Sequence, residues 1–151
     1  MRSVRLLVIG LLVAGMIGCS KSGKGGKGIS DEDGNIPRAA GSGELADVNF
    51  AFDSSALDES AKNRLRTNAN WLLDRPGQKV TVEGHCDERG TAEYNLALGE
   101  RRARATFDYL RSLGVKGDQV ATISYGEELP LDPGHDENAW SKNRRSHFSI
   151  R

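Results

Sequence analysis

A short turn and the helical segment after it carry the side chains best suited to binding a small charged ligand. Asp87 and Arg89 lie in the turn, and Tyr94, Leu98 and Arg102 recur every four residues along the helix. That spacing places the three side chains on one stripe, about 140° around the helix from the expected core stripe. A carboxylate and a guanidinium at opposite ends of a shallow pocket suit a ligand that carries both charges. The alternative, which the pattern alone favours, is a solvated helix flank with a local Asp–Arg pair.

The core stripe of this helix is expected to consist of apolar residues within about 60° of one another. They are Leu96, Ala103, Phe107 and Leu110. The helix is expected to run from about residue 92 to 113 and to close at Gly114. Asp87 and Arg102 lie off this stripe, so their substitution is expected to affect binding more than folding.

Four segments have the pattern of β-strands. They cover residues 48–52, 80–84, 120–125 and 145–151. The first, second and fourth alternate apolar and polar residues, which predicts a sheet with one covered face and one wetter face.

A further helix is expected between the first two strands. It begins near Leu57, has apolar residues at helical spacing, and is stopped by Pro76-Gly77. A long loop with Pro130 and Pro133 is expected before the last strand. The predicted fold is therefore α+β, in the order β-α-β-α-β-β, with a mixed four-stranded sheet and both helices packed on one face.

The composition argues against one functional class. The chain has 151 residues, with 21 Lys+Arg against 21 Asp+Glu and a formal net charge of zero. A nucleic-acid-binding protein would show a basic face or stripe, so no nucleic-acid partner is expected. This length accommodates one ordinary domain with additional segments.

Residues 1–18 have the layout of a secretory signal peptide. Arg2 and Arg5 precede a short apolar stretch that ends just before Cys19. Small residues before a cysteine resemble the lipobox of bacterial lipoproteins, which implies cleavage before Cys19 and attachment of lipid to it. Ser20 after the cysteine implies, by the sorting habit of those lipoproteins, the outer membrane. The alternative is an ordinary signal peptide with an incidental cysteine.

Residues 19–44 are expected to form the lipidated cysteine and a flexible linker, and residues 45–151 the folded domain. Glycine, lysine and serine dominate the linker, which has no apolar period and cannot bury a core. Fully extended, the linker could reach about 80 Å. A lipid at one end and a domain at the other would make it a tether.

Three motifs in the folded domain resemble one known family. They are Gly-His-Cys-Asp-Glu-Arg-Gly at 84–90, Asn-Leu-Ala-Leu-Gly-Glu-Arg-Arg-Ala at 95–103, and Ser-Lys-Asn-Arg-Arg at 141–145. In this order they are similar to the OmpA-like peptidoglycan-binding domain, and within that family to the peptidoglycan-associated lipoproteins (Pal). The resemblance covers residues from about 47 to 151.

The resemblance implies that the ligand is the peptide stem of peptidoglycan, held at meso-diaminopimelate. Matched position by position, the ligand-binding residues would be Phe52, Asp53, Asp87, Arg89, Leu98 and Arg102. The free end of diaminopimelate carries an ammonium and a carboxylate on one carbon. Asp87 would accept from the ammonium, and Arg102 would bind the carboxylate through two parallel hydrogen bonds. Leu98 and Phe52 would cover the aliphatic chain between them.

The resemblance also implies a cellular role. The chain would be a lipid-anchored outer-membrane protein whose domain faces the periplasm and tethers that membrane to the cell wall. Its partners would be peptidoglycan, TolB and other Tol proteins, in a Tol-Pal system involved in envelope integrity and cell division. No cofactor is expected.

Two other functions stay open at this point. A cell-wall peptide hydrolase, such as a zinc or thiol amidase, would need a nucleophile with an oriented base or a three-ligand metal. His85, Cys86 and Asp87 are consecutive, so they make a poor metal-ligand set, and no H-E-x-x-H or G-x-S-x-G motif occurs. We therefore expect no catalytic residues and no metal. The other function is a wall-anchoring part of a motility or secretion machine.

Four further residues have simpler expected roles. Cys86 is expected to be buried and inert, and Trp140 to be a packing residue. Arg144 and Arg145 either support the pocket or form a solvated basic turn before the last strand.

Overall fold

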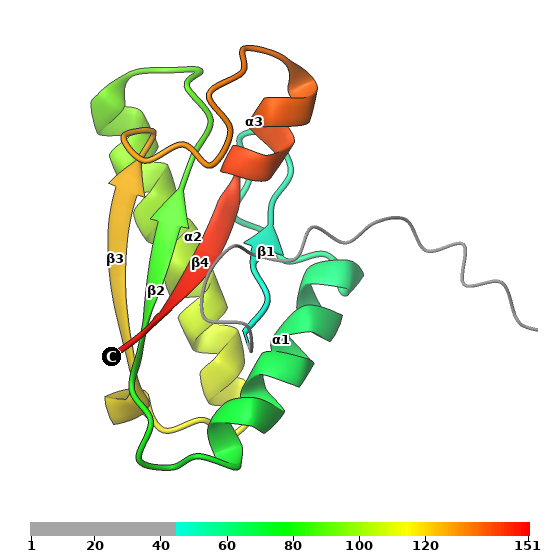
Figure 1. The fold of residues 1–151 in the computed structure, drawn as a ribbon, viewed down its shortest axis with the longest axis vertical. Coiled ribbons are helices and arrows are strands. Elements are labelled where there is room, and N and C mark those ends of the chain that lie inside the picture. The colour runs from blue at the N-terminus through cyan, green and yellow to red at the C-terminus, as the bar shows by residue number, and fades with distance from the viewer. Residues whose placement is uncertain (1–44) are drawn as a thin grey trace, which may run out of the picture. The chain divides into compact units, whose positions relative to one another are not determined.

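A computed structural model describes residues 45–151, and Figure 1 shows the elements that they form. The strands are β1 (Val48–Asn49), β2 (Val80–His85), β3 (Val120–Gly126) and β4 (Arg145–Ile150). The helices are α1 (Glu59–Leu73), α2 (Ala92–Ser112) and α3 (Glu137–Asn143), with a 3-10 turn, η1 (Gly117–Gln119), before β3. Within the described residues, no helix has the length and apolar character needed to cross a membrane. The predictions for residues 1–18 and 19–44 fall outside the described part of the chain.

The four strands form one mixed sheet in the order β1-β4-β2-β3. β2 and β3 run parallel, whereas β4 is antiparallel to both of its neighbours. Helices α1 and α2 pack against one face of the sheet, where their buried side chains join those of the strands in a single core. The predicted α+β fold with a mixed four-stranded sheet is therefore confirmed.

The core lies between this sheet face and the two long helices. Val80, Val82 and Phe148 reach it from alternate strand positions, and Leu65 and Leu110 reach it from the helices. Complete burial of a side chain of this kind contributes about 1.5–3 kcal/mol. The apolar positions of the alternating strands therefore face the core, and their burial stabilises the fold.

Side-chain caps determine where the two long helices begin. The carboxylate of Asp58 accepts a hydrogen bond from the backbone N–H of Ala61 at 2.7 Å, so α1 starts slightly later than Leu57, its predicted start. The hydroxyl of Thr91 accepts one from the backbone N–H of Tyr94 at 3.2 Å. This second cap makes α2 begin immediately after the turn that carries Asp87 and Arg89.

Two glycines let α2 lie directly on β2. A Cβ atom added to Gly84 would come within 1.9 Å of the carbonyl oxygen of Gly99, and one added to Gly99 would come within 2.8 Å of the carbonyl oxygen of Gly84. Real Cβ atoms do not approach other atoms this closely, so both positions require glycine. The contact brings the middle of α2 against the last residues of β2, next to the turn.

This contact also sets which face of α2 is buried, and the sequence prediction of that face was partly wrong. The buried side of α2 centres on Gly99 and includes Leu98 and Arg102, which were expected on a stripe apart from the core. Leu96 was expected in the core but is 52% exposed. Ala103 and Leu110 are fully buried, as predicted. The periodicity located the helix, but only the backbone contact at Gly99 determines its rotation.

Two further differences concern local structure near the site. A short helix, α3, occupies part of the segment expected to be a loop, and Asp136 caps it by accepting from the N–H of Ala139 at 2.9 Å. β1 covers only Val48–Asn49, and Phe52 at the end of the predicted strand is 57% exposed. Only Ala139 and Asn143 of α3 are buried, so the sequence lacks the apolar periodicity that would predict this helix.

Candidate functional site

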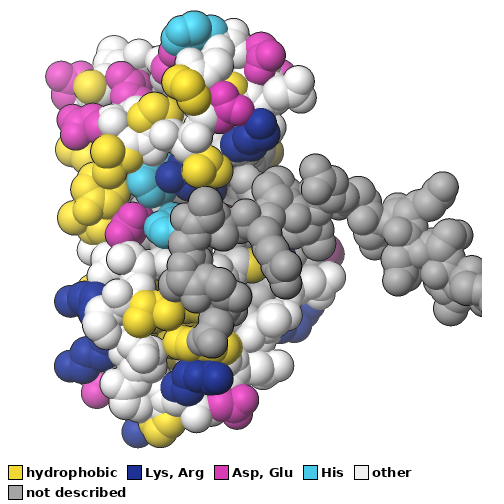
Figure 2. Space-filling model, viewed as in Figure 1, with side chains coloured by type: hydrophobic (Ala, Val, Ile, Leu, Met, Phe, Trp, Pro, Cys, Tyr) yellow, Lys and Arg dark blue, Asp and Glu magenta, His cyan; other side chains and the backbone are white. Residues whose placement is uncertain are grey.

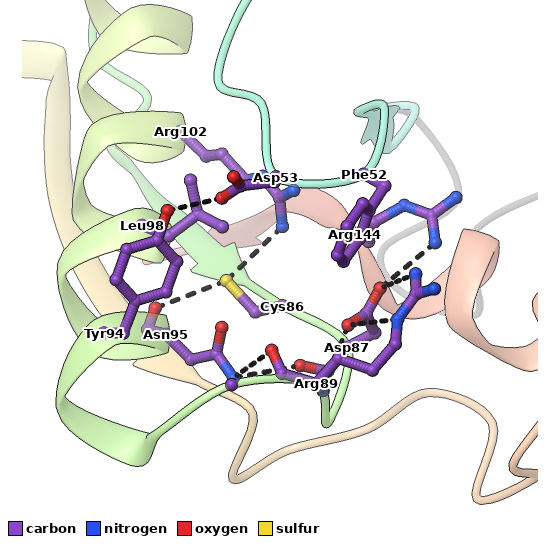
Figure 3. Close-up of a pocket in the computed structure, with 11 residues that line it drawn as sticks. Phe52, Asp53, Cys86, Asp87, Arg89, Tyr94, Asn95, Leu98, Arg102 and Arg144 are labelled. Carbon is purple, nitrogen blue, oxygen red and sulfur yellow. Dashed lines mark hydrogen bonds and ion pairs between the residues drawn. The ribbon is translucent and has the colours of Figure 1, made fainter.

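The six residues predicted to bind ligand line a single cavity of about 200 Å³ (Figure 3). The cavity lies where β2 ends, α2 begins and the loop after β1 passes over them. The six residues are Phe52, Asp53, Asp87, Arg89, Leu98 and Arg102, and the remaining lining residues are Cys86, Gly90, Tyr94, Asn95 and Arg144. Three segments that are distant in sequence therefore supply one site.

Asp87 is buried and is bound by two arginines. Arg89 donates from Nε at 3.2 Å and from Nη2 at 2.7 Å, and Arg144 donates from Nη1 at 3.1 Å. Burial alone would raise the pKa of Asp87, but the hydrogen bonds from Arg89 and Arg144 outweigh it and hold that pKa below its ordinary value. Asp87 is therefore an anion, and Arg144 supports the pocket, one of the two roles left open for it.

Arg102 lines the same cavity without a carboxylate partner. Its guanidinium donates to the carbonyl oxygens of Ser54 at 2.8 Å, His85 at 2.8 Å and Ala51 at 3.1 Å, and to the Cys86 sulfur at 3.3 Å. Among the described residues it forms no ion pair, although its side chain is fully buried. Burial lowers the pKa of Arg102 from its ordinary value. A buried cation that lacks a counter-ion is a favourable place for an anionic group of a ligand.

Arg89 forms the rim of the cavity between two aromatic rings. Its guanidinium lies 4.0 Å from the ring centroid of Phe52 and 4.2 Å from that of Trp140. The indole N–H of Trp140 donates to Glu88 at 2.9 Å. Trp140 is thus more than a packing residue, because it links α3 to the turn that carries Asp87.

Glu137, also on α3, completes the ionic network around Asp87. Its carboxylate accepts from Nη2 of Arg144 at 2.6 Å and lies 3.6 Å from Nη2 of Arg89. Both arginines that bind Asp87 are therefore shared with a second, more exposed carboxylate. The prediction from sequence did not include Trp140 or Glu137 in the site, because it did not recognise α3.

The opposite rim is formed by Asp53 and Tyr94. Asp53 has a backbone φ of 51°, in the left-handed region that Asp adopts more readily than most residues. Its carboxylate accepts a hydrogen bond from the hydroxyl of Tyr94. Figure 3 shows this pair on the far side of the cavity from Asp87 and Arg89.

Asn95 holds the turn against the first turn of α2, and sequence reasoning overlooked it. Its side-chain amide donates to the carbonyl oxygens of Asp87 and Arg89, each at 3.2 Å, and to the carboxylate of Glu127. Asn95 is buried, and a buried asparagine needs such partners. The signal available in the sequence was a polar residue one position before Leu96, on what proves to be the buried side of α2.

Comparison with known proteins assigns the chain to a family. The sequence pattern of the OmpA family matches residues 49–144, which contain all six cavity residues named above. The chain belongs to the OmpA family.

Within this OmpA-family assignment, the chain is similar to several peptidoglycan-associated lipoproteins. The one from Pseudomonas aeruginosa is 40% identical over 157 residues, covering 93% of each chain. The one from Haemophilus influenzae is 41% identical over 145 residues, covering 95% of each. The one from Rhizobium meliloti is 52% identical over 97 residues, so the match spans 64% of this chain but only 55% of that relative.

Solved structures agree with the fold of this OmpA-family domain. The crystal structure of the peptidoglycan-associated lipoprotein from Burkholderia pseudomallei is 40% identical, has a TM-score of 0.67, and covers 70% of this chain and 89% of that one. The C-terminal domain of Helicobacter pylori MotB has a TM-score of 0.67 at 21% identity, covering 71% of this chain and 84% of that one. At that identity the second likeness concerns the fold alone.

The thiol in the cavity of this OmpA-family domain is enclosed. Cys86 is buried, its sulfur contacts the carbonyl oxygen of Asn95 at 3.3 Å, and burial raises the pKa of its thiol. The neighbouring His85 is also buried, and its ring nitrogens have no hydrogen-bond partner in the described part of the chain, although Nε2 lies 3.7 Å from the Glu83 carboxylate. Within residues 45–151, no group of three His, Cys, Asp or Glu side chains is placed to hold a metal ion.

Proposed function

We propose that this protein is a lipid-anchored, non-enzymatic lipoprotein that binds peptidoglycan non-covalently and tethers the outer membrane to the cell wall. The OmpA-family domain and the relatives named peptidoglycan-associated lipoproteins support the binding role. The lipobox-like stretch before Cys19 and the following linker support the anchor and the periplasmic orientation of the domain. The proposed domains are the signal peptide at 1–18, the lipidated cysteine and linker at 19–44, and the wall-binding domain at 45–151.

The observation that carries this proposal is the charge arrangement of the cavity. Arg102 is buried there without a carboxylate partner among the described residues, while the Asp53 and Asp87 carboxylates lie across the space from one another. The free end of meso-diaminopimelate carries a carboxylate and an ammonium on one carbon. Its carboxylate would complete the environment of Arg102, and its ammonium would bind the carboxylates.

The lining also fits the rest of that ligand. Leu98 and the exposed ring of Phe52 offer apolar surface for the aliphatic chain of diaminopimelate. Asp87 already accepts from Arg89 and Arg144, so the ammonium would share this carboxylate with them. Asp53 accepts only the Tyr94 hydroxyl among the described residues, so it would provide the less contested carboxylate.

The groups that surround the cavity support a non-enzymatic role. A thiol hydrolase needs a thiolate activated by a base, but the Cys86 thiol contacts a carbonyl oxygen and a guanidinium, and burial raises its pKa. By resemblance to the peptidoglycan-associated lipoproteins, the proposed protein partners are TolB and other Tol proteins. The proposed role is in a Tol-Pal system that contributes to envelope integrity and cell division.

The test is binding of the full-length chain, in detergent, to purified sacculi. Free meso-diaminopimelate should compete for binding, whereas cadaverine, a diamine of similar length that lacks both carboxylates, should compete far less. Asp53→Asn, which keeps an acceptor for Tyr94 and removes a charge, should weaken binding by about tenfold or more. Asp108→Asn, at an exposed position on α2, is the matched control and should bind normally. Equal competition by cadaverine, or release of wall fragments during incubation, contradicts the proposal.

A further inference from the structure

One edge of the sheet is open and carries no charge. β3 is the last strand in the sheet order and, within the described residues, pairs only with β2. Its residues, Val-Ala-Thr-Ile-Ser-Tyr-Gly, include no charged side chain and no proline. Proteins normally protect such edges with charges, proline or a covering segment, because unpaired backbone groups template the addition of another strand. The middle of β3 is exposed, with Ile123 at 42%.

The two sides of this edge differ in chemistry. The hydroxyl of Ser124 donates to the carbonyl oxygen of Leu96 at 2.7 Å, so Ser124 points toward α2. Because side chains alternate along a strand, Ile123 and Tyr125 point to the face away from the helices. On that outer side β3 presents Ile123 and Tyr125, and the neighbouring β2 places Glu83 beside Ile123. Figure 2 shows hydrophobic side chains near the upper end of β3.

The side that faces α2 is hollowed and acidic. Two hollows of about 250 and 150 Å³ lie between α2 and β3, with Leu96 between them. Their charged lining residues are Glu93, Glu100, Glu127 and Glu128. A strand laid along β3 would therefore have apolar neighbours on one side and carboxylates on the other.

We propose that the β3 edge binds an extended segment of a protein partner, one that alternates apolar and basic side chains and adds to the sheet as a fifth strand. Backbone hydrogen bonds to β3 would hold the segment, since main-chain pairing supplies the affinity in this mode of recognition. Its apolar side chains would contact Ile123 and Tyr125, and its lysines or arginines would face Glu93 and Glu100. Pairing with a second copy of this chain is disfavoured, because it would bring these acidic residues near those of the other copy.

The experiment uses the full-length chain in detergent and a short fluorescent peptide that alternates lysine and valine. The comparison peptide has glutamate in place of lysine. Binding is followed by fluorescence anisotropy, and the site by hydrogen exchange of the β3 backbone amides. The lysine–valine peptide should bind and protect residues 120–126, whereas the glutamate–valine peptide should bind at least about tenfold more weakly.

Two variants locate the interaction. Ile123→Lys places a charge on the edge and should weaken binding by about tenfold or more, whereas Asn70→Lys, exposed on α1, should leave it unchanged. Glu93→Gln in the first turn of α2 should weaken binding by about two- to fivefold without altering β3, and Glu59→Gln in the first turn of α1 is its matched control.

The outcomes separate the proposal from its alternatives. Equal binding of the two peptides, loss of binding in the control variants, or protection elsewhere than at β3 overturns it. Self-association that disappears in Ile123→Lys would assign the edge to a second copy instead, and also overturns it. If Ile123→Lys fails to fold, Glu93→Gln with its control decides the question alone.

Discussion

The guanidinium of Arg102 lies inside the domain and joins the loop after β1 to the end of β2. The carbonyl oxygens of Ala51, Ser54 and His85 all accept from it. The sequence placed Arg102 on a stripe away from the core, and that placement is wrong, because its side chain is fully buried. The same buried side chain would serve both stability and ligand binding.

Arg102→Ala should therefore destabilise the domain as well as remove binding. Loss of the guanidinium leaves buried carbonyl oxygens without donors, at a cost of about 2–4 kcal/mol in total. Arg102→Lys should lose much of the same stability, because an ammonium cannot reach acceptors in several directions. Urea unfolding measures the effect, with exposed Arg101→Ala as the control expected to change stability by within about 0.5 kcal/mol. An unaltered free energy of unfolding for Arg102→Ala would contradict this role.

His85 should make the domain sensitive to acid. Burial, followed by the charges of Arg145 and His147, lowers the pKa of His85 to about 3. In the unfolded chain the pKa of His85 is about 6.5. Between these two pKa values the imidazole is therefore protonated in the unfolded state but neutral in the folded state. Stability should therefore fall progressively as the pH drops from about 6.5 toward 3.

His85→Phe should reduce that acid-dependent loss, because phenylalanine keeps the stacking with Tyr125 and removes the titrating group. The measurement is urea unfolding at about pH 7 and pH 4 for the wild type and the variant. His135→Phe, at an exposed histidine, serves as the control. If the wild type and His85→Phe lose the same stability between the two pH values, His85 is not responsible.

Helix α3 has few buried residues of its own but supports the binding cavity through Trp140. Trp140→Leu removes the ring beneath Arg89 and the indole donor to Glu88. Affinity for sacculi should fall by about two- to fivefold, the loss expected for one exposed cation–π contact. Trp140→Phe should bind more nearly like the wild type, because it keeps the ring. If the phenylalanine variant binds as weakly as the leucine variant, the stacking with Arg89 does not contribute.

The contact between α2 and β2 depends on the absence of a side chain at Gly99. Gly99→Ala would place a Cβ atom 2.3 Å from the Ser124 hydroxyl and 2.8 Å from the Gly84 carbonyl oxygen. Moving α2 away from the sheet to relieve these clashes should cost about 1–3 kcal/mol or more. Gly77→Ala is the control, since a Cβ there meets nothing within 4 Å. Thermal and urea unfolding of both variants test this, and equal stability of the two would refute it.

These elements also show how much of the structure can be predicted from the sequence. Alternation and helical spacing were enough to place β2, β4, α1 and α2, because burial on one face imposes those periods. The rotation of α2 was not predictable, because it depends on a backbone contact between Gly84 and Gly99, which are in different elements. The cavity residues came from resemblance to a family, and spacing alone would have favoured a solvated Asp–Arg pair. The contribution of α3 was missed because this short helix lacks an apolar stripe.

At the scale of the whole molecule, we expect the proposed lipid anchor and the proposed wall-binding cavity to function independently of each other. Cys19→Ser should prevent lipid attachment, so the chain should be lost from the outer-membrane fraction. Binding of the purified variant to sacculi should stay within about twofold of the wild type, because the cavity lies in residues 45–151. Membrane fractionation, mass spectrometry of the amino terminus and a sacculus pull-down measure the three properties. An unmodified Cys19 in the native protein would show that the anchor was assigned wrongly.

The strand order of the sheet bears on when the domain acquires its structure. β4 comes last of the four strands in the chain but lies between β1 and β2, and both pair with it. Until β4 is available, β1 has no strand to join, and the sheet lacks its middle. Such long-range pairing slows folding, because distant segments must meet before any contact stabilises them. The sheet of this domain can therefore be completed only after residues 145–150 have been synthesised.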